Sequence, residues 1–216
     1  MLSGFMPGSA ADETAVSPEG RRTLRRSLLA RRRALPAEEW ARLSLMIRRL
    51  LQDSLPRLAA LRVGFCWPRD NEPDLRPLIA HWHRQGDPGF MALLPVVVAA
   101  DCGLAFRAWS PGVAMTTDRY GIPVPASGAP VLPQALLIPV VGFDAAGFRL
   151  GYGGGYFDRT LASLRPRPLA IGVGFELSRL ASVHPERHDE PLDLIVTEVG
   201  IWRCVGSTGS AHRDSG

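Results

Sequence analysis

Lysine is absent from this chain, and all 25 of its basic residues are arginines. A chain without lysine cannot form a Schiff base with a carbonyl substrate, and it cannot supply the lysine of a P-loop. Arginine suits bidentate contacts with phosphate or carboxylate oxygens. The simpler explanation of the bias is genomic base composition, so the arginines alone do not identify a ligand.

Cysteine is scarce: Cys66, Cys102 and Cys204 are widely separated and form no Cys-x-x-Cys pair. A disulfide framework or a zinc site is therefore not expected. His81 and His83 lie two positions apart in a predicted helix, so they do not share a helical face. With no third ligand evident, they do not predict a metal site.

Long apolar runs are also lacking. The longest, from Phe90 to Ala100, is about half of what a bilayer span needs and contains Pro95, so it predicts a buried strand. The first twenty residues lack the basic start and apolar stretch of a secretory signal, so we expect a cytoplasmic protein. At 216 residues, 46% hydrophobic and 21% charged, the chain has the size and composition of one globular domain.

Apolar periodicity predicts an alternation of helices and strands. Two amphipathic helices are expected at 17–34 and 37–54. Beyond them, the predicted elements are strands at 61–67, 90–97, 104–109, 135–143, 169–175 and 193–201, and helices at 72–86 and from 156 onward. This order predicts an α/β fold, a single three-layer, Rossmann-like domain with a mostly parallel sheet between helical layers. We expect this single α/β domain to span residues 17–204, between a disordered extension (1–16) and a mobile tail (205–216).

The stretch "FRLGYGGGYFDRTLASL", Phe148 to Leu164, places four glycines in five positions between a strand and a helix. Glycines there let main-chain N–H groups approach a phosphate without a Cβ in the way, where the helix dipole favours an anion. Neither G-x-x-x-x-G-K-S/T nor G-x-G-x-x-G matches the stretch. A tight turn would need only one or two glycines, so the excess favours phosphate or nucleotide binding.

Acidic residues occur beside this loop and again near the last predicted strand. Asp158 falls in the first helical turn, where the helix dipole alone favours an acidic residue. Asp189, Glu190 and Asp193 precede the strand at 193–201. In a parallel sheet the loop before a strand and the loop after one lie at opposite ends, so an encounter between Asp189 and the glycine loop does not follow from the sequence alone. If they meet beside a polyphosphate, the two aspartates would make a Mg²⁺ site.

The run "GFDAAGFRLGYGGGYFDRTL", residues 142–161, resembles the signature of the 5-formyltetrahydrofolate cyclo-ligase family, also called methenyltetrahydrofolate synthetases. That signature reads roughly F-D-x-x-G-x-R-L-G-x-G-x-G-Y-Y/F-D. Shorter segments resemble the family in the same order along the chain, namely "RRTLR", "NEPDLRPLI", "YGIPVP" and "HDEPLDLIVTE". The resemblance covers about residues 20 to 200.

This resemblance implies an enzyme that uses ATP and Mg²⁺ to convert 5-formyltetrahydrofolate into 5,10-methenyltetrahydrofolate. ADP and phosphate are released, and the formyl oxygen is phosphorylated on the way, giving an iminium phosphate. The implied partners are ATP and the folate, with no nucleic acid and no membrane, and the chain is expected to be a monomer or a weak homodimer.

The resemblance also implies the site residues. ATP would be held by Arg21, Arg25, Arg149, Leu150, Gly151, Tyr152, Gly153, Gly154, Gly155, Tyr156 and Phe157. Arg149, Tyr152 and Tyr156 would act in catalysis. The folate would lie against Trp67, Glu72, Tyr120 and Tyr156, and Asp158 and Asp189 would bind Mg²⁺. The other arginines of the first helix, Arg22, Arg26 and Arg31 to Arg33, are expected to form a solvated face.

Three residues depart from the family pattern. Arg21 stands where the family usually has lysine, Val124 where Glu or Gln is more common, and Ala135 where an acidic residue is common. The last two support an alternative, a relative that binds folate and nucleotide without turnover. A second alternative is an RNA-binding module built on the arginine-rich helix, but the net charge of +4 is mild and no aromatic residues interleave with the arginines.

Overall fold

The computed structural model describes residues 18–204, which contain a seven-stranded sheet of order β11-β10-β9-β6-β1-β2-β3. Its strands are β1 (Arg62–Gly64), β2 (Met91–Val96), β3 (Ala105–Trp109), β6 (Ala135–Pro139), β9 (Leu169–Val173), β10 (Leu194–Thr197) and β11 (Gly200–Arg203). Neighbours from β10 to β2 are parallel, and β3 and β11 are antiparallel at the two edges. The predicted, mostly parallel α/β fold is confirmed.

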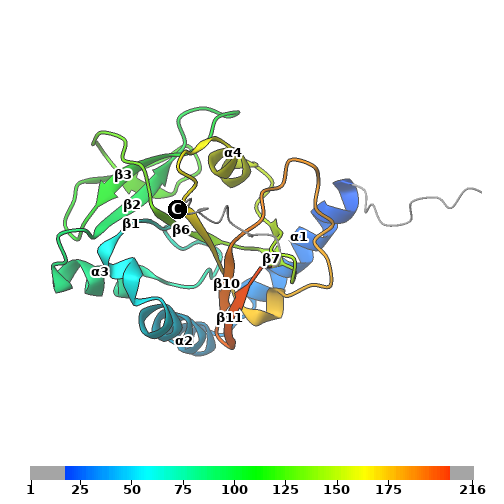
Figure 1. Cartoon of the computed structure of the whole chain (residues 1–216). Helices are drawn as coiled ribbons and strands as arrows, with labels where there is room; N and C mark the ends of the chain where they lie inside the picture. Colours follow the sequence, from blue (N-terminus) through cyan, green and yellow to red (C-terminus); the bar gives the residue numbers. More distant parts are fainter. Residues whose placement is uncertain (1–17, 205–216) are drawn as a thin grey trace, which may run out of the picture.

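Helices cover both faces of the sheet, as Figure 1 shows. The helices are α1 (Pro18–Arg33), α2 (Ala37–Ser54), α3 (Arg76–Gln85) and α4 (Tyr156–Ser163), with short 3₁₀ turns η1 (Pro56–Ala60) and η2 (Glu176–Ser178). In β6, Ala135 and Leu137 pack with the apolar sides of α2 and α3, whereas Leu136 and Ile138 pack with Leu161 of α4. This alternation along one strand divides the core into two apolar layers, one on each side of the sheet.

The order of the parallel strands locates a ligand site. Numbered along the chain, the parallel strands β1, β2, β6, β9 and β10 lie in the order 2-1-3-4-5, which reverses direction between β1 and β6. In open α/β sheets, ligands bind beyond the carboxyl ends of the strands at such a reversal. The fold therefore points to the region beyond Gly64 and Pro139, where β1 and β6 end.

Two predicted strands are wrong in extent because the chain turns inside them. The stretch 193–201 is not one strand: β10 and β11 form an antiparallel hairpin in which Thr197 pairs with Gly200. The apolar run 135–143 contains β6 and a separate β7 (Gly142–Phe143), which pairs with β8 (Arg149–Leu150) as a small second sheet. A third sheet, of β4 (Met115–Thr117) and β5 (Pro123–Pro125), was not predicted.

The helix predicted at 72–86 begins later, at Arg76. Oδ1 of Asp74 accepts the main-chain N–H of Arg76 at 3.0 Å, and Pro77 lies in the first turn, where a missing N–H costs nothing. The residues before this helix include a turn, in which the N–H of Glu72 donates to the carbonyl of Arg69. Residue 17 and the predicted segments 1–16 and 205–216 lie outside the described residues. No helix within 18–204 is long and apolar enough to cross a membrane.

Candidate active site

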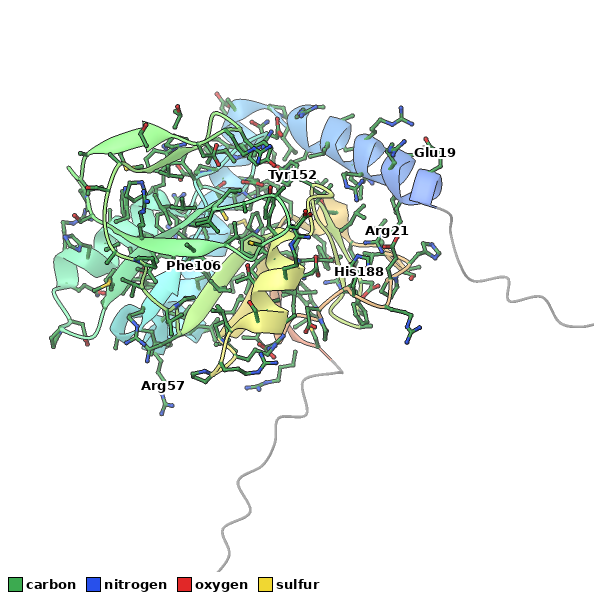
Figure 2. All side chains as sticks on the ribbon, turned by 90° about the horizontal axis from the view of Figure 1, so that it is seen from above. Glu19, Arg21, Arg57, Phe106, Tyr152 and His188 are labelled. Atoms are coloured by element: carbon green, nitrogen blue, oxygen red, sulfur yellow. The ribbon has the colours of Figure 1, made fainter. Side chains whose placement is uncertain are left out.

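A cavity of about 1000 Å³ lies beyond the carboxyl ends of the central strands. Its walls come from the ends of β1, β2 and β6, the start of α1, the glycine loop and the segment before β10. Figure 2 labels three of its lining residues, Arg21, Tyr152 and His188. The predicted residues in the lining are Arg21, Arg25, Trp67, Glu72, Tyr120, Arg149, Gly151, Tyr152, Gly153, Gly154, Gly155, Tyr156, Phe157, Asp158 and Asp189.

Leu150 is the one predicted site residue that does not line the cavity. Its side chain is fully buried beside Leu28 and Val141, and its carbonyl accepts the N–H of Val141 at 2.9 Å. Leu150 therefore pairs within the small sheet and packs into the core, and its contact with ATP stays a prediction from the sequence.

The glycines between β8 and α4 are accommodated at their positions for different structural reasons. Gly153 and Gly155 have φ of +95° and +63°, a region that strongly favours glycine. A Cβ on Gly154 would approach the Tyr156 ring to 2.8 Å. Gly151 is not among the glycines with a positive φ, and a Cβ built there would have nothing within 4 Å. Its bare backbone instead leaves open space at the cavity wall, which suits the close approach of a ligand.

Arg149 joins the glycine loop to the segment before β10. Its Nη2 lies 2.9 Å from Oδ1 of Asp158, and its Nη1 donates to the carbonyl of Glu190 at 2.8 Å. Only 6% of Arg149 is exposed, and burial lowers the pKa of its guanidinium while Asp158 opposes that shift. The result is a cation and a carboxylate held together at the base of α4.

Asp189 does reach the glycine loop's cavity, which the sequence left open. The chain between β9 and β10, residues 174–193, is long enough to pass along the cavity before the next strand begins. Oδ2 of Asp189 accepts from Nη1 of Arg21 at 2.7 Å and from the N–H of Glu186 at 2.8 Å. The same Arg21 nitrogen donates to the carbonyl of His184 at 2.9 Å.

The two aspartates fit a partial Mg²⁺ ligand set. Among residues 18–204 there is no cluster of three acidic, histidine or cysteine ligands. The contacts of the two side chains use Oδ1 of Asp158 and Oδ2 of Asp189, so each keeps a second carboxylate oxygen. Mg²⁺ is usually held by one or two carboxylates together with substrate phosphates and waters, and this donor set matches that pattern.

Arg25 places a second cation directly against the glycine loop. Its Nε donates to the carbonyl of Gly151 at 2.6 Å, and its guanidinium would lie 3.5 Å from a Cβ on Gly153. Burial lowers the pKa of Arg25, and the nearby charges of Arg21 and Arg22 lower it further. Arginines gathered beside bare backbone favour an anionic ligand.

Aromatic side chains line another part of the cavity. The hydroxyls of Tyr120 and Tyr156 lie 2.8 Å apart, and their rings meet edge to face with centroids 6.3 Å apart. That hydrogen bond raises the pKa of Tyr156. The Arg76 guanidinium lies over the Trp67 ring, 5.0 Å from its centroid, and the Trp67 and Trp109 rings meet edge to face with centroids 6.2 Å apart. These walls suit a flat ring system.

A buried carboxylate faces the same cavity. Oε1 of Glu72 accepts from the Tyr152 hydroxyl at 2.7 Å, and Oε2 accepts from the N–H of Arg69 at 3.1 Å. Glu72 is only 3% exposed, and burial raises its pKa. Glu72 therefore presents a buried carboxyl group at the cavity wall.

Arg32 was expected on a solvated face, and this prediction is wrong. Arg32 is 1% exposed, and its Nη2 donates to the Tyr152 hydroxyl at 2.5 Å. The sequence carried a signal for it, since Arg21, Arg25, Leu28 and Arg32 follow helical spacing along one face of α1.

Residues 17–198 match the model of the 5-formyltetrahydrofolate cyclo-ligase family. The chain belongs to this family. It is 29% identical over 178 residues to the 5-formyltetrahydrofolate cyclo-ligase of Escherichia coli, covering 80% of this chain and 97% of that protein. The NMR structure of Aquifex aeolicus 5,10-methenyltetrahydrofolate synthetase aligns with a TM-score of 0.73 at 28% identity, over 90% of this chain and 97% of that one. The predicted family, and with it the ligase class, is confirmed.

The departures from the cyclo-ligase pattern at Val124 and Ala135 are not among the cavity-lining residues, although Pro123 beside Val124 is. Val124 is 3% exposed within β5, and Ala135 is fully buried at the start of β6. Neither side chain lines the cavity. Arg21, in contrast, does line the cavity, so it is the departure that could alter ligand contacts.

Proposed function

We propose that this chain is an active ligase that converts 5-formyltetrahydrofolate and ATP into 5,10-methenyltetrahydrofolate, ADP and phosphate. One observation carries the proposal: the same cavity contains a glycine loop flanked by arginines and a wall made of aromatic rings and a buried carboxylate. A triphosphate and a folate placed against these two parts would lie in one enclosure, which a direct transfer between them requires.

ATP is assigned to the glycine loop and its arginines. The main chain from Gly151 to Phe157 would face the phosphates, with Arg21, Arg25 and Arg149 supplying positive charge. Phosphoryl transfer needs little covalent chemistry from the protein, so positioning and charge neutralisation account for most of the catalysis. Asp158 and Asp189 would hold Mg²⁺, which when bound neutralises phosphate oxygens and orients them.

The folate is assigned to the other wall. Trp67, Tyr120 and Tyr156 would enclose the pterin ring, and Glu72 would accept its N–H groups. In the reaction the formyl oxygen bonds to the γ-phosphorus as the bond to ADP breaks, giving an iminium phosphate. N10 then bonds to the formyl carbon and loses its proton, and the carbon–oxygen bond breaks to release phosphate. Tyr152 and Tyr156 lie in the glycine loop and at the start of α4, where the two substrates would meet.

The structure favours neither alternative. The catalytically silent relative was supported only by Val124 and Ala135, and neither lines the cavity. For an RNA module, Arg21 and Arg32 are buried, and the exposed Arg22 and Arg26 pair with Glu19 at 3.0 and 3.8 Å. A cytoplasmic location, a monomer or weak homodimer, and the lack of nucleic-acid or membrane partners remain predictions from the sequence.

The experiment is a direct assay of the purified full chain with Mg²⁺, ATP and 5-formyltetrahydrofolate. We expect absorbance of the methenyl chromophore to grow, with one ADP formed per product molecule. Replacing ATP with a non-hydrolysable analogue should abolish the signal. If no chromophore forms although ATP binds, the catalytic proposal is wrong and the silent relative is favoured.

A further inference from the structure

Arg32 reaches from the C-terminal part of α1 into the interior and donates to three separate segments. Its Nε donates to the carbonyl of Asp70 at 2.8 Å, and its Nη1 donates to the carbonyl of Val140 at 3.1 Å. Its Nη2 donates to the hydroxyl of Tyr152 at 2.5 Å and lies 3.8 Å from Oε1 of Glu72. An arginine that is 1% exposed needs such partners, and two of them, Tyr152 and the turn at Asp70, lie next to Glu72.

The hydrogen bonds of Arg32 fix the direction in which the Tyr152 hydroxyl donates. A guanidinium can only donate, so the Tyr152 oxygen accepts from Arg32 and its own hydrogen points to Oε1 of Glu72, 2.7 Å away. The N–H of Arg69 donates to Oε2 at 3.1 Å. Both carboxylate oxygens therefore face donors, an arrangement that suits the ionised form of Glu72.

The turn that carries Glu72 is held by the same end of α1. The N–H of Glu72 donates to the carbonyl of Arg69 at 2.8 Å, across Asp70 and Asn71, which have φ of +49° and +55°. Such conformations persist in residues other than glycine only where the surroundings hold them. Besides Arg32, Nε of Arg33 donates to Oδ1 of Asp70 at 2.9 Å, and the Asn71 amide donates to the Arg33 carbonyl at 3.3 Å.

We propose that Arg32 is a positioning residue of the folate subsite, which holds Glu72, through Tyr152 and the 69–72 turn, as an ionised acceptor for the N–H groups of the pterin ring. Arg32 itself touches no substrate. The inference rests on the proposed function, because it takes the ligand of Glu72 to be a folate. It extends that function by giving a role to a buried arginine and to Tyr152, which stands at a variable position of the family signature.

The charges around Glu72 predict a pH dependence. The groups that face it are Arg32 from α1, Arg69 and Asp70 from its own turn, Tyr152 from the glycine loop and Cys66 after β1. Burial raises the pKa of Glu72, and Arg32 exerts the largest opposing effect. Removing the Arg32 charge should raise the pKa of Glu72 further. A protonated Glu72 offers one acceptor fewer to the folate. As pH falls, the protein without the Arg32 charge should therefore lose folate affinity at a higher pH than the wild type does.

The test is the KM for 5-formyltetrahydrofolate between about pH 5.5 and 8.5 in the wild type, Arg32→Met, Arg32→Lys and Tyr152→Phe. In Arg32→Met we expect this KM to rise as pH falls, with a midpoint about one pH unit above that of the wild type and about a tenfold rise at the acid end. In Arg32→Met the KM for ATP and kcat should stay within about twofold. In Arg32→Lys the midpoint should lie close to that of the wild type. Tyr152→Phe should shift the midpoint less than Arg32→Met does.

The matched control is Arg31→Met, which removes a charge from the exposed face of the same helix. Its profile should coincide with the wild type. The inference is overturned if the pH profile of Arg32→Met also coincides with that of the wild type. It is also overturned if Arg32→Met, Arg32→Lys and Tyr152→Phe all have a lower Tm, a lower kcat and higher KM values for both substrates, with no shift of the pH midpoint. Folate binding, measured by the quenching of tryptophan fluorescence, separates the proposed function from the proposed role of Arg32. A wild type that binds no folate overturns the proposed function, whereas normal binding and turnover with unshifted midpoints overturn only the role of Arg32.

Discussion

Arg149 and Asp158 form an ion pair, 2.9 Å between Nη2 and Oδ1, that ties three parts of the chain together. Arg149 belongs to β8 and Asp158 to the first turn of α4. The third part is Glu190, whose N–H donates to Oδ1 of Asp158 at 3.0 Å and whose carbonyl accepts from Arg149 at 2.8 Å. Asp158 therefore has a structural role as well as the proposed role in metal binding, and an experiment has to separate the two.

Asp158→Asn should separate them, because the amide keeps an acceptor oxygen but loses the charge. We expect the Mg²⁺ concentration for half-maximal activity to rise at least about tenfold, with a smaller fall in Tm than in Asp158→Ala because the acceptor oxygen is kept. Asp158→Ala should lower the free energy of unfolding by about 3 kcal/mol, since it removes both the charge and the acceptor that face the buried Arg149 guanidinium. Mg²⁺ titrations of activity, together with thermal melts, measure both effects.

Asp193→Asn is the control for the Mg²⁺ titration. Asp193 pairs with Arg167 at 2.8 Å and does not line the cavity, so its loss should leave the Mg²⁺ requirement unchanged. If Asp158→Asn kept the wild-type Mg²⁺ requirement, the metal assignment would be wrong.

Gly151 and Gly155 should respond differently to alanine. At Gly151 the added Cβ meets no protein atom within 4 Å, so we expect the free energy of unfolding to change by less than about 0.5 kcal/mol. The methyl group would occupy the space proposed for a phosphate, so the KM for ATP should rise about tenfold or more. At Gly155, where φ is +63°, alanine should cost about 1–2 kcal/mol of stability. An unchanged KM for ATP in Gly151→Ala would contradict the phosphate assignment.

The sheet was predictable from the sequence because its central strands are buried on both faces. β9 and β10 read as continuous apolar runs, and each lies between two neighbouring strands. Apolar patterning does not show where a chain reverses, so the β10–β11 hairpin was taken for one strand. The same limit hid the break between β6 and β7, where Val140 and Val141 stay buried although the strand has ended.

The parts of the site that are contiguous in sequence were also predictable. The glycine loop and Asp158 lie within one strand–loop–helix unit, whose local physics indicates phosphate binding. The contact between Arg21 and Asp189 spans 168 positions, and that between Arg32 and Tyr152 spans 120. Only the path of the 174–193 segment and the packing of α1 bring these partners together, and neither follows from local pattern.

Arg21→Lys tests whether the departure from the family at this position matters. The contacts of Arg21 with Asp189 at 2.7 Å, His184 at 2.9 Å and Glu186 at 3.7 Å all come from one nitrogen, Nη1. A single ammonium group could make the same contacts, so we expect the KM for ATP to change by less than about threefold. Arg21→Met, which has no charge, should raise it about tenfold or more. Equal effects of the two substitutions would show that the guanidinium shape matters at this position.

Val124→Glu, which introduces a residue more typical of the family, should lower stability without improving folate binding. Val124 is 3% exposed within β5 and does not line the cavity, so the new carboxylate would occupy a buried site that now holds an apolar side chain. We expect the free energy of unfolding to fall by about 2–4 kcal/mol, and the folate KM of the folded protein to stay within about twofold. Val124→Thr, which replaces one methyl group with a hydroxyl and keeps a similar shape, should cost about 1 kcal/mol. Urea melts and folate KM values measure both outcomes. A folate KM that falls severalfold in Val124→Glu would mean that position 124 reaches the substrate, and that this chain has lost a polar contact there.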